Sequence, residues 1–219
     1  MVSKLIHLIS QCFYPAYCYQ CYEIIPVEEV FCYKCLAMIK PVVSLHVAIT
    51  PKKIIKVFAG GAYQEPLKQL VIKKFKSEML ASKHLAQIII LQIPDEIIQS
   101  VDLFVPIPLH WMRYAQRGYN QAQVMAQTLA DHYSQQMVPA LKRTRRTKYQ
   151  SMLSKEKRQE NIDGAFVCKN RYRSIVAGKH IGLVDDLYTS GATVAYAAKK
   201  LFEIGAKEIT VFVGCRKID

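Results

Sequence analysis

Short apolar runs alternate with segments of helical periodicity along much of this chain of 219 residues. The runs 101–107 and 181–184 predict buried strands, and the segment 56–63 predicts another, although Gly60-Gly61 weakens it. Apolar residues at helical spacing predict helices after Pro66, over 80–89, over 121–133 and over 194–201. We therefore expect an α/β fold with a mostly parallel sheet flanked by helices.

The length of the chain suits one medium α/β domain with a small appendage, and it is sufficient to bury a sizeable core. We expect a small N-terminal module over 1–45 and a main domain over 46–219, with the proline-bearing connection 41–51 leading into the main domain. No apolar run approaches the roughly 20 residues of a membrane span, and the run 5–9 is too short for a signal peptide. These features predict a cytoplasmic protein.

Four of the seven cysteines form two Cys-x-x-Cys pairs, Cys18 with Cys21 and Cys32 with Cys35. Each pair brings two thiolates round a tight turn, and two pairs complete the tetrahedral ligand set of a structural Zn²⁺ site. The segment is too short for a core of its own, so we expect the metal to hold it together. Redox chemistry or chance pairing is the alternative interpretation. The charges within 18–35 sum to −2, so this module has no basic face for nucleic acid.

Two adjacent carboxylates, Asp185 and Asp186, stand where the strand 181–184 is expected to end, and a turn of small and hydroxyl-bearing residues follows them. Such a turn before a helix suits phosphate, because its N–H groups and hydroxyls donate and the helix N-terminus attracts anions. Carboxylates beside a phosphate suit sugar hydroxyls or a hydrated Mg²⁺. The alternative is an ordinary helix N-cap with exposed aspartates. We predict a sugar-phosphate site formed by Asp185, Asp186, Thr189, Ser190, Gly191, Ala192 and Thr193.

A second candidate phosphate loop follows the strand 101–107. It comprises 105–109, with Ile107 and Pro108 at its turn, and Arg113 and Arg117 come shortly after it. The alternative is that both arginines are solvated positions at the start of a helix.

The positive charge of the chain is concentrated in two stretches. Segment 142–158 has a net charge of +7 and segment 52–76 a net charge of +6, which together account for the whole surplus of +13. The charge-rich stretch 141–166 shows little apolar periodicity, which predicts a mobile loop with a short helix. A cationic loop beside a phosphate pocket can follow a single-stranded nucleic-acid backbone, and nearby aromatic rings can stack on bases. The predicted DNA-binding residues are Arg113, Arg143, Arg145, Arg146, Lys148 and Tyr149; closure of the loop over the pocket is the alternative.

The segment 181–193 closely resembles the phosphoribosyl pyrophosphate (PRPP) loop of type I phosphoribosyltransferases, with Ser190 where threonine is usual. Further motifs occur in order along the chain, and together they resemble the ComF competence family almost over the full length. They are the cysteine quartet, Lys-Phe-Lys at 74–76, Val-Pro-Ile-Pro at 105–108, Arg-Gly-Tyr-Asn-Gln at 117–121, Gly-Ala-Phe at 164–166 and Cys-Arg at 215–216.

The resemblance implies a phosphoribosyltransferase-like domain that follows an N-terminal zinc module. This domain is expected to bind PRPP with Mg²⁺ and to hold its pyrophosphate with the loop after 101–107. The resemblance also implies handling of incoming single-stranded DNA on the cytoplasmic side of the membrane. Other competence proteins, such as an uptake helicase or a recombination mediator, and the inner membrane surface are then expected partners. An active transferase remains the alternative, with Arg117 stabilising the departing pyrophosphate. Glutamine-driven purine synthesis is not expected, since no glutaminase domain fits.

Overall fold

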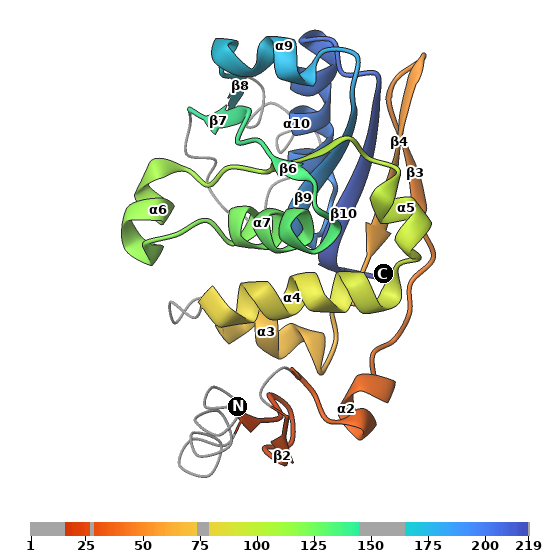
Figure 1. Ribbon diagram of the computed structural model, residues 1–219, viewed down its shortest axis with the longest axis vertical. Helices are drawn as coiled ribbons and strands as arrows, with labels where there is room; N and C mark the ends of the chain where they lie inside the picture. The colour runs from red at the N-terminus through yellow and green to blue at the C-terminus, as the bar shows by residue number, and fades with distance from the viewer. Residues whose placement is uncertain (1–15, 27–28, 74–78, 145–164, 219) are drawn as a thin grey trace, which may run out of the picture.

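A six-stranded sheet forms the centre of the molecule (Figure 1). The computed structural model describes residues 16–26, 29–73, 79–144 and 165–218. The strand order is β3-β4-β10-β9-β5-β6; neighbours from β4 to β6 are parallel, and β3 is an antiparallel edge strand. The strands are β3 (Leu45–Thr50), β4 (Lys53–Ala59), β5 (Leu103–Pro106), β6 (Gln136–Met137), β9 (His180–Tyr188) and β10 (Glu208–Arg216).

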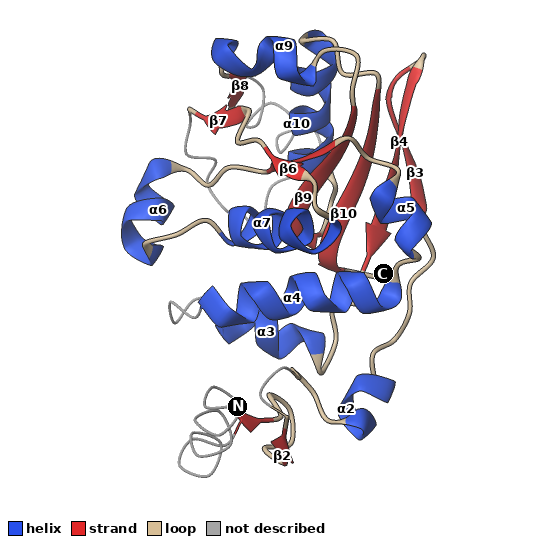
Figure 2. Ribbon diagram, in the orientation of Figure 1, coloured by secondary structure: helices blue, strands red, loops and turns tan. Residues whose placement is uncertain are grey.

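Helices cover both faces of this sheet (Figure 2). One face carries α3 (Leu67–Lys73), α4 (Met79–Gln92), α5 (Asp95–Gln99) and α7 (Gln121–Tyr133). The other carries α9 (Arg173–Val176), α10 (Ala192–Glu203), the 3-10 turn η2 (Asn170–Tyr172) and the two-stranded ribbon of β7 (Leu141–Arg143) with β8 (Phe166–Cys168). Because successive strand residues point to opposite faces, Leu183 and Val184 of β9 belong to different hydrophobic clusters.

A small N-terminal module lies below α3 and α4 in Figure 1. It contains the antiparallel pair β1 (Ala16–Tyr17) and β2 (Ile24–Ile25), followed by α2 (Tyr33–Ala37). Its Tyr19 ring meets the ring of His84 in α4 edge to face, with the centroids 5.2 Å apart. His84 is therefore buried between the module and the main domain. Strand β3 begins at Leu45, at the predicted domain boundary, and the division itself stays a prediction.

The helices predicted from apolar periodicity are confirmed. Helix α7 spans 121–133 as expected, α4 covers 79–92, and α10 extends the expected segment 194–201 by a few residues at each end. The predicted end of the strand over 181–184 needs correction. Strand β9 does not end at Val184 but continues to Tyr188, because its pairing with β10 persists to Tyr188 and Arg216.

The interpretation of 41–51 as a connection is wrong, since β3 occupies 45–50. Its alternating residues Leu45, Val47 and Ile49 pack on the core, which gives an edge strand that the neighbouring prolines tolerate. The stretch 141–166 also contains the strand β7 and the first residue of β8, neither of which the sequence predicted. The predicted loop and short helix fall largely on 145–164, outside the described residues.

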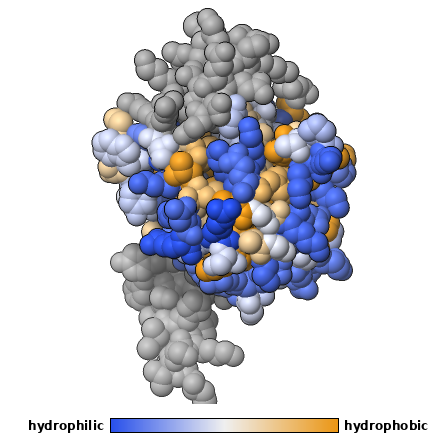
Figure 3. Space-filling view, turned by 90° about the horizontal axis from the view of Figure 1, so that it is seen from above, coloured by the Kyte–Doolittle hydropathy of each residue, from blue (hydrophilic) through white to orange (hydrophobic). Residues whose placement is uncertain are grey.

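Seen from the end that carries α9, hydrophilic residues surround smaller groups of hydrophobic ones (Figure 3). In the part of the chain that the structure describes, no helix is long and apolar enough to cross a lipid bilayer.

Candidate functional site

The acidic pair projects past the end of a neighbouring strand. The last residue pair between β5 and β9 joins Pro106 to Val184, while β9 continues beside β10 as far as Tyr188. Asp185 and Asp186 therefore lie at the carboxyl end of the sheet, next to the loop that leaves β5. In open α/β sheets this is the edge where ligands bind.

The turn after β9 is shaped by Gly191, which is the N-cap residue of α10 and has φ of 74°. A side chain at this position would overlap the phenol ring of Tyr188, which is buried beneath the turn. Glycine therefore meets two requirements, the left-handed backbone and the close approach of the ring. Thr189 and Ser190 are exposed on this turn, and Thr193 lies in the first turn of α10.

A cavity of about 650 Å³ opens at this edge and brings together many of the predicted residues. Residues predicted for the two phosphate loops and for DNA share its wall: Ile107, Pro108, Arg113, Arg117, Arg143, Asp185, Asp186, Thr189 and Thr193. Ser190, Gly191 and Ala192 complete the turn without belonging to that wall. The cavity thus joins segments that lie far apart in sequence.

Arginines face both aspartates across this cavity. Burial lowers the pKa of the Arg117 guanidinium, and the negative charge of Asp186 opposes that shift. Burial likewise lowers the pKa of Arg143, with Arg113 acting in the same direction and Asp185 against it. Arg143 is further held over the ring of Phe166, 5.3 Å from its centroid. These arginines remain charged at neutral pH, so the cavity wall contains both cationic and anionic groups.

The sequence did not single out several other residues of the wall. Asn120, Gln121 and Ala122 stand at the start of α7, and the remaining ones are Tyr63, Val71, Gln116 and Leu187, whereas Leu109 belongs to the predicted loop 105–109. The motif 117–121 carried a signal for Asn120 and Gln121, but no pattern marked the apolar ones. Nδ2 of Asn120 donates a hydrogen bond to the carbonyl of Ile107 (3.0 Å), which fixes the start of α7 against the loop after β5.

This arrangement can hold an anion at one end and hydroxyl groups beside it. Guanidinium groups and a helix N-terminus favour phosphate, while adjacent carboxylates accept hydrogen bonds from hydroxyls or hold a hydrated divalent cation. The volume falls within the range of ordinary ligand pockets.

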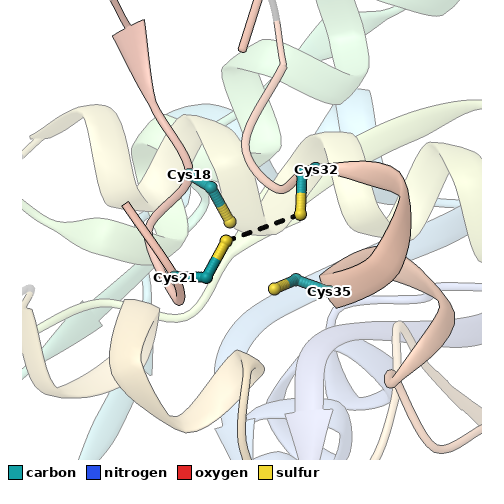
Figure 4. A group of neighbouring side chains, drawn as sticks. All are labelled: Cys18, Cys21, Cys32 and Cys35. Carbon is teal, nitrogen blue, oxygen red and sulfur yellow. Dashed lines mark hydrogen bonds between the residues drawn. The ribbon is translucent and has the colours of Figure 1, made fainter. Parts of the chain in front are cut away.

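Four cysteines converge in the N-terminal module (Figure 4). Their sulfur atoms all lie within 4.8 Å of one another, and Cys21 Sγ is 3.6 Å from Cys32 Sγ. A tetrahedral Zn²⁺ with Zn–S bonds of about 2.3 Å needs sulfur atoms about 3.8 Å apart, so the four residues fit the ion. The backbone N–H of Cys18 donates to the carbonyl of Glu23, and that of Leu36 to Cys32, which closes both turns.

The thiols of this cluster are not at their ordinary acidity. Burial and the neighbouring thiols of Cys32, Cys21 and Cys18 raise the pKa of Cys35. Burial opposes ionisation of Cys18 as well, but nearby backbone groups outweigh it and lower the pKa of that thiol to about 6. Thiolates packed this closely repel one another, and a divalent cation removes that repulsion.

Two of the residues predicted to bind DNA, Arg113 and Arg143, line the cavity described above. The other four, Arg145, Arg146, Lys148 and Tyr149, lie outside the described residues.

The phosphoribosyl transferase domain family matches residues 115–219 of the chain. Competence protein F of Haemophilus influenzae is 32% identical over 164 residues, which cover 69% of each chain. The DNA utilization protein YhgH of Escherichia coli (strain K12) is 32% identical over 162 residues, 71% of this chain and 70% of that protein. A glutamine PRPP amidotransferase structure from B. subtilis aligns with a TM-score of 0.38 and 19% identity, covering 67% of this chain and 26% of that one.

The mostly parallel sheet, the matched family and the four-cysteine cluster together define a phosphoribosyltransferase-like domain with an N-terminal cysteine module. The chain belongs to the competence protein F (ComF) family.

Proposed function

We propose that this protein is a competence factor that binds single-stranded DNA on the cytoplasmic side and carries a pocket for PRPP or another ribose 5-phosphate ligand. The names of its relatives, competence protein F and DNA utilization protein, support a role in DNA uptake. The cavity beside Asp185 and Asp186 carries the ligand part of the proposal. Zn²⁺ on the four cysteines serves structure, and Mg²⁺ accompanies PRPP.

The wall of the cavity supports a specific orientation of the ligand. The 5′-phosphate accepts hydrogen bonds from the turn 189–193 at the N-terminus of α10. The ribose hydroxyls donate to Asp185 and Asp186, and the same carboxylates would hold a hydrated Mg²⁺ that accompanies the ligand. A pyrophosphate on the sugar then meets Arg117 and the loop 107–108.

Isothermal titration with ribose 5-phosphate tests the pocket. Replacing Asp185 and Asp186 together with Ala is expected to weaken binding by more than 100-fold, since each hydrogen bond to a charged group contributes roughly 1.5–3 kcal/mol. Inorganic phosphate has no sugar hydroxyls, so its affinity is expected not to fall in the double variant. Asp102→Ala is a matched control, because Asp102 accepts the N–H of His180 at the amino end of β9 (2.7 Å). Equal affinity of wild type and double variant for ribose 5-phosphate contradicts the assignment.

A transferase reaction is the second candidate function, and the position of Arg117 favours it. Arg117 lines the same cavity as Asp186, where a pyrophosphate leaving the sugar carbon would develop charge. Release of pyrophosphate from PRPP in the presence of candidate acceptors measures this activity. Arg117→Ala is expected to reduce turnover more than it reduces ribose 5-phosphate affinity. If the wild type shows no turnover with any acceptor, the pocket acts only in binding.

DNA binding is proposed for the basic stretch 142–158, whose charge suits contacts to phosphates. Binding independent of base sequence is expected, because backbone contacts carry no sequence information. A helicase or recombination mediator of the uptake machinery is the proposed protein partner, and the inner membrane surface the proposed site of action.

A further inference from the structure

The side chain of Gln121, in the wall of the cavity, makes no hydrogen bond within the part of the chain that the structure describes. Gln121 exposes 1% of its surface, and among the described residues neither Oε1 nor Nε2 of its carboxamide has a hydrogen-bond partner. Gln121 is the first residue of α7 and lines the cavity together with Asn120 and Ala122. The carboxamide is therefore one donor and one acceptor left unsatisfied beside a ligand site.

The backbone at this position is well fixed. The Asn120 side chain donates to the carbonyl of Ile107, and its own carbonyl accepts from the N–H groups of Gln123 and Val124. Met125, one turn further along α7, is fully buried in the core. The unsatisfied carboxamide therefore belongs to a rigid helix start and not to a loose surface segment.

A buried polar group without a partner destabilises the folded state by about 1–3 kcal/mol, and native proteins contain few such groups. An apolar side chain of the same length would occupy this place without that cost. A hydrogen-bonding group from outside the chain would remove this cost, and a ligand in the adjoining cavity can supply one.

The chemistry of the carboxamide limits what this ligand group can be. A phosphate only accepts hydrogen bonds, so it satisfies Nε2 and leaves Oε1 facing an anion. A neutral edge with a donor beside an acceptor satisfies both atoms, and nucleobases present such edges. The same wall contains Tyr63, Val71 and Ala122, which suit a flat ring.

We propose that Gln121 recognises the base of a nucleoside 5′-phosphate, so that this pocket takes nucleotides in preference to the bare sugar phosphate. The inference rests on the proposed ribose 5-phosphate site and adds a subsite to it. Contact with the base requires the buried carboxamide to turn toward the cavity about its side-chain bonds. Asp185 and Asp186 hold the sugar in both kinds of ligand.

Titration of the wild type with ribose 5-phosphate and with AMP, CMP, GMP and UMP tests this subsite. At least one nucleotide is expected to bind about 10- to 30-fold more tightly than ribose 5-phosphate, as two neutral hydrogen bonds provide. Gln121→Met keeps the length of the side chain and removes both polar atoms, so it is expected to abolish this advantage while ribose 5-phosphate affinity stays unchanged. Gln123→Met, at an exposed position of the same helix outside the cavity wall, is the control and is expected to preserve the advantage.

Thermal unfolding without ligand separates recognition from a structural role. Gln121→Met is expected to unfold at the same or a higher temperature than the wild type, because it removes an unsatisfied buried group. A marked fall in unfolding temperature would show that the carboxamide stabilises the fold and would overturn the proposal. Equal losses of ribose 5-phosphate and nucleotide affinity would overturn it too, since Gln121 would then contact the sugar. If the wild type binds neither ligand, the proposed ribose 5-phosphate function fails, and the subsite that rests on it fails with it.

Discussion

Asn120 Nδ2 lies 3.0 Å from the carbonyl oxygen of Ile107 and donates a hydrogen bond to it across thirteen residues of chain. Both residues are more than nine-tenths buried. This bond connects the loop after β5 to the first turn of α7, and both segments line the cavity. The shape of the proposed pyrophosphate end of the pocket therefore depends on one amide group.

Asn120→Ala is expected to lower the free energy of unfolding by about 1–3 kcal/mol, because it leaves a buried carbonyl without its donor. Loss of helix capping does not explain such an effect, since the Asn120 side chain makes no capping hydrogen bond to α7. Urea unfolding measures the change. Gln123→Ala, at an exposed position of the same helix turn, is the control, and a similar small loss in both variants would contradict the assignment.

Gly191→Ala is expected to destabilise the protein more than Gly178→Ala. Both glycines have positive φ, 74° and 76°, so each substitution costs roughly 1–2 kcal/mol through the backbone. A Cβ at Gly178 meets nothing within 4 Å, whereas one at Gly191 overlaps the Tyr188 ring. Thermal unfolding compares the two variants, and ribose 5-phosphate affinity is expected to fall only for Gly191→Ala. Equal destabilisation by both would show that the Tyr188 contact is unimportant.

Purified protein never exposed to chelator is expected to contain roughly one Zn²⁺ per chain. Cys35→Ser is expected to lose the ion on dialysis and to make the N-terminal module sensitive to proteolysis, because metal binding and folding of such modules are coupled. Elemental analysis and limited digestion are the measurements. Cys168→Ser provides the control, since the Cys168 thiol donates to the Lys200 carbonyl, away from the cluster. Metal-free wild type would contradict the zinc assignment.

Stability is expected to fall as the pH decreases from about 6.5 to about 4, because burial lowers the pKa of His84 from 6.5 to about 4. In that window the unfolded chain binds a proton that folded His84 does not, so protonation favours unfolding. His84→Phe keeps a ring against Tyr19 and is expected to reduce the dependence of the unfolding free energy on pH. Urea unfolding measures this dependence, with the metal content checked at each pH. His132→Gln, at an exposed position, is expected to retain the wild-type slope; the same slope in His84→Phe would contradict the prediction.

Charge reversal at Arg145, Arg146 and Lys148 is expected to remove most affinity for a single-stranded oligonucleotide. These residues belong to the stretch 142–158, which has a net charge of +7. The slope of log affinity against log salt concentration is expected to become shallower by roughly 0.7 for each phosphate that the variant no longer neutralises. Arg143 is left intact because it lines the cavity. Fluorescence anisotropy measures binding. The control replaces the exposed Lys83, Lys199 and Lys207 with Glu, which changes the net charge by the same amount outside this stretch. If the loop variant binds as tightly as the wild type, this stretch does not bind the DNA and instead serves the pocket.

The sequence by itself determined the features whose parts are close together in the chain. Two Cys-x-x-Cys pairs form the four-sulfur cluster because each pair spans a single turn. The helix over 121–133 follows directly from its apolar periodicity. The acidic pair, the turn and the start of α10 are recognisable because they are consecutive from 185 to 193. Local patterns are sufficient here because local backbone geometry fixes the arrangement.

Only the tertiary structure decided which distant residues share the cavity. Tyr63, Val71 and Arg143 meet Asp185 and Asp186 because the strand order brings separate segments to one edge of the sheet. The sequence pattern placed Arg143 in a basic loop, whereas in the structure Arg143 is half-buried and lies over the ring of Phe166. Strand β3 was missed because pairing with β4, and not its proline-flanked sequence, makes it a strand. The burial that leaves Gln121 unsatisfied likewise arises from long-range packing, which local periodicity does not encode.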